Sequence, residues 1–114
     1  MNVLETAISH LSSALAVPVS SNVPAQRPDA FVTVERAGGS VTKVDDHASL
    51  TMQVWDRDRL ALEQLTEDTV MAMLRMPDAV DEVFSAEVQK SYYPEQVNGY
   101  FPRYVLAVEI YCGA

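Results

Sequence analysis

The last apolar stretch of the chain, residues 103–112 (RYVLAVEIYC), constrains the fold more than any other segment. Every second side chain in it is large and apolar, which is the two-residue period of a β-strand: Tyr104, Leu106, Val108 and Ile110. The positions between them include Val105 and Ala107, so the opposite face is partly apolar as well. Apolar side chains on both faces predict a strand in the middle of a sheet.

Other segments supply the rest of this sheet. Residues 49–55 (SLTMQVW) alternate between apolar and polar side chains, which is typical of a half-buried antiparallel strand. Residues 31–36 are rich in β-branched side chains, residues 83–91 indicate a fourth strand, and residues 17–19 could form a short additional one. Residues 37–47, between the strands at 31–36 and 49–55, contain two glycines and many polar side chains. They are either a long loop or the tip of a hairpin.

Two segments have the spacing of amphipathic helices. Residues 2–16 place apolar side chains three and four positions apart, and Pro18 stops the pattern. Residues 58–76 do the same, and Pro77 ends that helix. The length of the chain suits one domain, residues 1–114. We therefore expect an α+β two-layer sandwich, with a mixed or antiparallel four-stranded sheet, two helices on one face and a protruding hairpin.

Composition excludes several classes of protein. Sixteen Asp and Glu against eight Lys and Arg give a net charge of −8, which is unsuited to gripping a nucleic-acid backbone. The single cysteine, Cys112, rules out a scaffold held together by intrachain disulfides. No apolar run approaches the roughly 20 residues that span a bilayer. The first residues lack the basic region of a secretory signal, so we expect no membrane segment, and we expect the protein to stay where it is made or to leave the cell only as part of an assembly.

The sequence offers little that could carry catalysis. Asp45, Asp46 and His47 could in principle bind a metal or supply a base, but three adjacent loop residues do not readily converge on one ion. A solvated hairpin is the simpler interpretation. Cys112 ends an apolar strand and fits a small core residue better than a nucleophile. With no phosphate-binding glycine pattern, no HExxH and no Ser-His-Asp signature, we expect no enzyme, no catalytic residue, no cofactor and no metal.

Aromatic side chains outside the main core pattern are the more informative feature. Trp55 lies on the polar face of its strand beside Thr51 and Gln53, and residues 92–102 hold four aromatic rings. Such residues are enriched at protein interfaces, although these rings could instead fold back and complete a small core. The candidate subunit or partner interface comprises hairpin and aromatic positions: Gly38, Gly39, Ser40, Val41, Lys43, Trp55, Tyr92, Tyr93, Tyr100, Phe101 and Arg103.

Three stretches together resemble tail terminator proteins, also called tail completion proteins, of long-tailed phages and prophages, in a style closest to actinobacterial phages. They are the loop and strand VPVSSNVPAQRPDAFVTVERAGG, the strand end MQVWDRD before a helix, and the late GYFPRYVLAVEIYC. The resemblance covers residues 17–39, 50–74 and 97–112. It is one of layout, because none of these pieces is a catalytic motif.

The resemblance implies a structural role in the virion. Such proteins form a hexameric ring on the head-proximal end of the tail tube, stop tube growth and present a docking surface to the neck of the head. The implied fold is two helices against a sheet with a protruding hairpin. The implied partners are further copies of the chain, the tail tube protein and a neck or head-completion protein, with genomic DNA only passing through the lumen. The implied location is the head–tail junction, after assembly in the host cytoplasm.

Two other functions remain open from the sequence. A head-completion or neck protein next to this ring would share the size and the acidity. A small α+β domain that binds a ligand as a dimer, or acts as a minor enzyme, belongs to a different class. Stoichiometric binding of a metal or small molecule would favour that second alternative.

Overall fold

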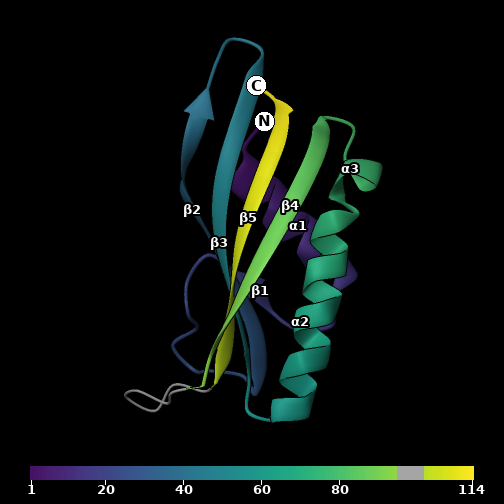
Figure 1. The fold of residues 1–114 in the computed structure, drawn as a ribbon. Helices are drawn as coiled ribbons and strands as arrows, with labels where there is room; N and C mark the ends of the chain where they lie inside the picture. Colours follow the sequence, from purple (N-terminus) through teal and green to yellow (C-terminus); the bar gives the residue numbers. More distant parts are fainter. Residues whose placement is uncertain (95–101) are drawn as a thin grey trace.

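The computed structural model describes residues 1–94 and 102–114, and these form an α+β fold (Figure 1). None of the helices in this part of the chain is long and apolar enough to cross a membrane. The elements follow in the order α1 (Val3–Ala14), β1 (Val19–Ser20), β2 (Ala30–Val41), β3 (Asp45–Asp56), α2 (Arg59–Leu74), α3 (Met76–Ala79), β4 (Val83–Tyr93) and β5 (Arg103–Gly113).

The sheet is mixed and has five strands in the order β1-β2-β3-β5-β4. β1 runs parallel to β2, and every other neighbouring pair is antiparallel. β5 lies between β3 and β4, so the central position predicted for residues 103–112 is confirmed. The expected count of four strands is wrong, because the short segment near residues 17–19 joins the sheet as the two-residue strand β1.

The helices cover one face of this sheet. Alternate side chains of β3 and β5 lie in one buried cluster with side chains from α1 and α2. The cluster holds Val3, Ala7, Leu11, Val32, Val34, Leu50, Met52, Val54, Leu62, Met73, Leu106, Val108 and Ile110, among others. The intervening residues of β3 and β5 point the other way, where none of the described helices packs. We call this second surface the open face.

Both long helices begin and end close to the predicted positions. The side chain of Asn2 caps α1, and that of Asp58 caps α2, each by accepting a hydrogen bond from a backbone N–H of the first turn. Pro77 does not simply end the second helix. It lies in the first turn of α3, where the missing N–H of proline has no helical partner to lose, so the described residues hold three helices instead of two.

Residues 37–47 form most of a long hairpin instead of a loop. β2 continues to Val41 and β3 begins at Asp45, so only residues 42–44 make the turn. A bulge between Arg36 and Gly38 shifts the register, and Gly39 beyond it has a φ of 122°. The predicted loop 92–102 also begins later, because β4 runs through residue 93.

Candidate assembly surface

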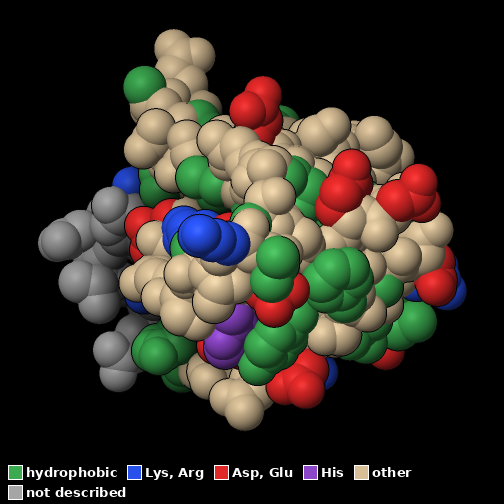
Figure 2. All heavy atoms as spheres, turned by 90° about the horizontal axis from the view of Figure 1, so that it is seen from above, with side chains coloured by type: hydrophobic (Ala, Val, Ile, Leu, Met, Phe, Trp, Pro, Cys, Tyr) green, Lys and Arg blue, Asp and Glu red, His purple; other side chains and the backbone are tan. Residues whose placement is uncertain are grey.

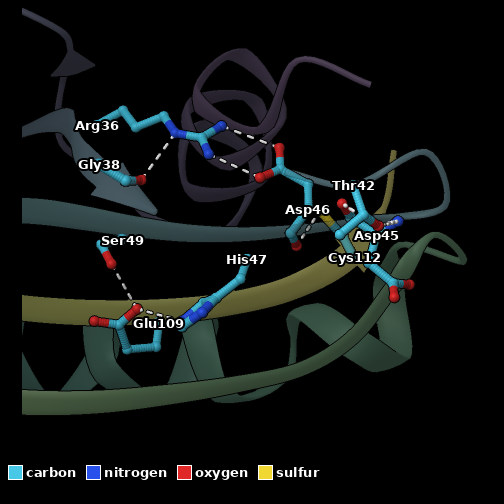
Figure 3. A network of polar contacts seen from close by, with 9 residues as sticks. All are labelled: Arg36, Gly38, Thr42, Asp45, Asp46, His47, Ser49, Glu109 and Cys112. Carbon is cyan, nitrogen blue, oxygen red and sulfur yellow. Dashed lines mark hydrogen bonds and ion pairs between the residues drawn. The ribbon is translucent and has the colours of Figure 1, made fainter. Parts of the chain in front are cut away.

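An ion pair links the two strands at the end of the β2–β3 hairpin, residues 36–50. The guanidinium of Arg36 donates to both carboxylate oxygens of Asp46, at 2.7 and 3.0 Å, and its Nε donates to the carbonyl of Gly38 at 3.0 Å (Figure 3). Asp46 is buried, and the hydrogen bonds from Arg36 hold the pKa of its carboxyl below the ordinary value. The pair therefore ties the bulged strand β2 to β3. We call residues 36–50 the hairpin arm.

The turn of the hairpin arm is ordered by Thr42. Its hydroxyl accepts hydrogen bonds from the backbone N–H groups of Val44 and Asp45, and its own N–H donates to the carbonyl of Asp45 at 2.8 Å. The N–H of Ala114 donates to the carbonyl of Val44 at 3.1 Å, which joins the turn to the chain beyond β5. The side chains at this end of the arm nevertheless point to solvent, since Val41 at the end of β2 is 64% exposed and Val44 in the turn is 71% exposed.

His47 lies on the open face, on the side of the hairpin arm opposite Asp46. Its Nε2 donates to the carboxylate of Glu109 at 2.8 Å, and the hydroxyl of Ser49 donates to the same oxygen at 2.7 Å. The hydrogen bond from Ser49 and, to a smaller extent, that from His47 hold the pKa of the Glu109 carboxyl below its ordinary value. The ring of His47 also stacks on that of Tyr111, with centroids 4.1 Å apart.

The suspected cluster of Asp45, Asp46 and His47 is thus divided by the pleat of β3. Successive side chains of a strand point to opposite faces, which sends Asp46 to Arg36 and His47 to Glu109. Among residues 1–94 and 102–114, no three His, Cys, Asp or Glu side chains lie where they could hold one metal ion. Cys112 is fully buried, burial raises the pKa of its thiol, and its S–H donates to the carbonyl of Asp46.

One end of the open face carries a row of stacked side chains. The guanidinium carbon of Arg103 lies 5.1 Å from the ring centroids of both Trp55 and Tyr93, and the Trp55 ring stacks on Phe31 at 5.4 Å. The register of the four strands explains the row, because Phe31 pairs with Trp55, Trp55 with Arg103, and Arg103 with Tyr93. Cation–π contact and ring stacking hold these side chains together.

This row corrects part of the predicted interface. Trp55 does lie on the face shared with Thr51 and Gln53, but only 3% of it is exposed, so in the single chain it completes packing instead of offering a contact surface. Tyr93, which is 45% exposed, and Arg103 do reach the surface of the open face. The interface role of these residues stays a prediction.

Tyr92 lies on the opposite face from its neighbour Tyr93. Its ring packs against that of Tyr104 with centroids 5.0 Å apart, and Arg59 of α2 lies over it at 4.4 Å. Tyr92 therefore helps to join α2 to the sheet. This fits the alternative in which the aromatic rings fold back and complete the core. The two remaining aromatic candidates, Tyr100 and Phe101, lie outside the described residues.

A hollow of about 350 Å³ lies beside the hairpin arm at the end of the sheet. Phe84 is the extra residue of a bulge in β4, and its exposed ring lines this hollow together with Tyr111, His47 and Asp45. Seen from above, the molecule shows hydrophobic side chains gathered beside a histidine, with Asp and Glu side chains near them (Figure 2). The exposed aromatic rings of Phe84 and Tyr111 make this end a candidate contact surface.

Sequence reasoning missed a second hollow, which lies between α2 and the edge strand β4. It has a volume of about 290 Å³ and is lined by Glu67, Val70, Met71, Val88 and Lys90. We call it the α2–β4 groove. The sequence did contain one indication of this groove, namely Met71 next to Val70. The apolar stripe of α2 runs through Leu62 and Met73 and leaves Met71 partly exposed.

Comparison with known proteins adds no relationship, because no family model matches the chain and no curated protein matches it either.

Proposed function

We propose that this chain is a phage tail terminator, which caps the head-proximal end of the tail tube as a hexameric ring at the head–tail junction. The ring would end tube polymerisation and present the surface on which the neck docks. The proposal starts from the resemblance over residues 17–39, 50–74 and 97–112. An α+β arrangement with helices on one face of the sheet supports the proposal at the level of fold class.

The observation that carries the proposal is that the sheet has two unlike edges, one of which carries the hairpin arm. The hairpin arm belongs to β2 and β3 at one side of the sheet, whereas β4 with α2 beside it forms the other side. A ring with rotational symmetry above two needs such unlike surfaces, because each subunit meets one neighbour with one surface and the next with another.

The task of a terminator follows from the same physics. Rings of a tail tube stack head to tail, and such a stack grows without limit unless something stops it. A protein that copies the docking surface on one side only, and differs on the other, ends the stack. The net charge of −8 suits a ring through which DNA passes, because an acidic lumen does not hold phosphates.

Loss of the chain from its phage or prophage tests this function. Electron microscopy of the mutant lysate should show DNA-filled heads beside unattached tails whose tubes are abnormally long or of uncontrolled length. Expression of the intact chain from a plasmid is the control and should restore infectious particles.

The same lysate separates the alternatives. Tails of normal length that join heads from another lysate would identify a neck or head-completion protein instead. Normal infectious particles would exclude both virion roles and leave a small ligand-binding domain. For that domain, the hollow lined by Phe84 and Tyr111 is the place to look for a bound small molecule.

A further inference from the structure

The tip of the hairpin arm, residues 41–45, exposes apolar side chains that could insert into a groove on another molecule. Val41 and Val44 are among the most exposed apolar side chains of the described residues, and they lie within four positions of each other. Single exposed valines are ordinary, but two on one ordered turn form a small apolar point. Lys43 and Asp45 flank Val44 and give this point one charge of each sign.

The order of the tip favours binding. Thr42 fixes the turn through its hydroxyl, and the Arg36–Asp46 pair fixes the strands below it. An element that is already rigid loses little conformational entropy when it docks, so more of its contact energy remains as affinity. A turn that served only to reverse the chain would not require exposed valines, because turn positions favour small polar residues.

The α2–β4 groove has matching features. Val70, Met71 and Val88 provide an apolar floor, and Glu67 and Lys90 stand beside it. Within residues 1–94 and 102–114, neither Lys43 of the tip nor Glu67 of the groove has an ion-pair partner. The two surfaces are therefore complementary in apolar character and in charge, with Lys43 suited to Glu67 and Asp45 to Lys90.

These two surfaces lie on opposite sides of the sheet. The tip joins β2 and β3, while the groove lies beyond β5 at the outer edge of β4. We propose that the tip of one subunit inserts into the α2–β4 groove of a second copy of this chain. This deepens the proposed function, on which it rests for the closed ring, because repeated head-to-tail contacts of this kind generate either a ring or a filament.

Cross-linking of the purified full-length chain tests the contact directly. Val44→Cys and Met71→Cys proteins are mixed at about 1 mM, where weak contacts are populated, and treated with a short bismaleimide. We expect a covalent product that contains one chain of each variant. Each variant alone should give little product, and the wild-type chain should give none, since its only cysteine is fully buried.

Charge exchange supplies a second, independent readout. Lys43→Glu or Glu67→Lys should each weaken self-association by about fivefold in analytical ultracentrifugation, and the double variant should recover most of the loss. Val44→Asp should abolish association, whereas Val23→Asp, at another exposed valine, should leave it unchanged. Unfolding curves of each variant exclude misfolding as the cause.

Three results would overturn the inference: a Val44→Cys chain that cross-links to its own kind, an oligomer insensitive to all these changes, or a chain that stays monomeric at about 1 mM. The fate of the proposed function is read separately from the mutant lysate. Normal particles in that lysate with intact tip-to-groove cross-linking would remove the terminator and keep the contact. Overlong tubes in the null lysate without such cross-linking would do the reverse.

Discussion

Just beyond the bulge of the hairpin arm, Gly39 has a backbone conformation that a larger residue cannot share. Its φ is 122°, and a Cβ placed on it would lie 1.9 Å from the carbonyl oxygen of His47. We expect Gly39→Ala to lower the free energy of unfolding by about 1–3 kcal/mol, because the backbone is strained and the neighbouring strand must move. Urea unfolding followed by Trp55 fluorescence measures this. Gly113→Ala, where a Cβ would meet nothing within 4 Å, is the matched control.

Asp46 makes the stability of the arm depend on pH. Arg36 holds the pKa of this carboxyl below its unfolded value, so the pair stabilises the fold above the unfolded pKa and ceases to do so as the pH falls through the folded pKa. Asp46→Asn should therefore cost about 1–3 kcal/mol at neutral pH, and the difference from wild type should shrink on acidification.

Unfolding experiments at a series of pH values down to the acid range measure that difference. Asp45→Asn, which changes the exposed neighbouring residue, should cost little at any pH. A wild-type advantage over Asp46→Asn that stayed constant with falling pH would contradict the role given to the ion pair.

Among the elements, α2 depends on its first turn. The carboxylate of Asp58 accepts a hydrogen bond from the N–H of Leu60, which has no helical partner. Asp58→Ala should lower the free energy of unfolding by about 1 kcal/mol, while Asp58→Asn, which preserves a capping oxygen, should cost clearly less. Chemical unfolding measures both, and equal losses for the two variants would show that the cap contributes little.

Elements with a strong hydrophobic period could be predicted from the sequence with the most detail, whereas the outer half of the hairpin could not. Residues 49–55 and 103–112 alternate regularly, so both strands and the central place of the second one followed from the pattern. The outer half of the hairpin is rich in glycine, polar and charged residues and has no such period. Its two strands pair with each other, and β3 also pairs with β5, which no local pattern reveals. Pro77 does not by itself distinguish the end of α2 from the start of α3, because proline can both follow one helix and begin another.

The features of the candidate surfaces also divide into those that the sequence shows and those that depend on packing. The glycines of the hairpin and the position of Arg103 beside an aromatic region were visible in the sequence. The burial of Trp55 was not, because it depends on Phe31, which lies opposite it only after the strands pair. Nor was the α2–β4 groove, since its floor combines Val70 of α2 with Val88 of β4, and only their packing brings the two together.

For the whole molecule, the proposed role makes a definite statement about copy number. Contacts between unlike surfaces close into a ring only when the rotation between neighbours divides a full turn, and a ring that caps a tube must match the symmetry of that tube. We therefore expect a reconstruction of the head–tail junction to show this chain as one hexameric ring per particle. Its hairpin arms should contact neighbouring subunits or the last tube ring.

Quantitative mass spectrometry of purified particles gives an independent count, with the tail tube protein as internal reference. The ratio of this chain to the tube protein should correspond to a single ring and should not increase with tail length among related phages. A dimer or an isolated monomer at the junction would contradict the ring. A ratio that rose with tail length would mean that the chain lines the tube instead of ending it, because only a terminal ring is independent of the number of rings beneath it.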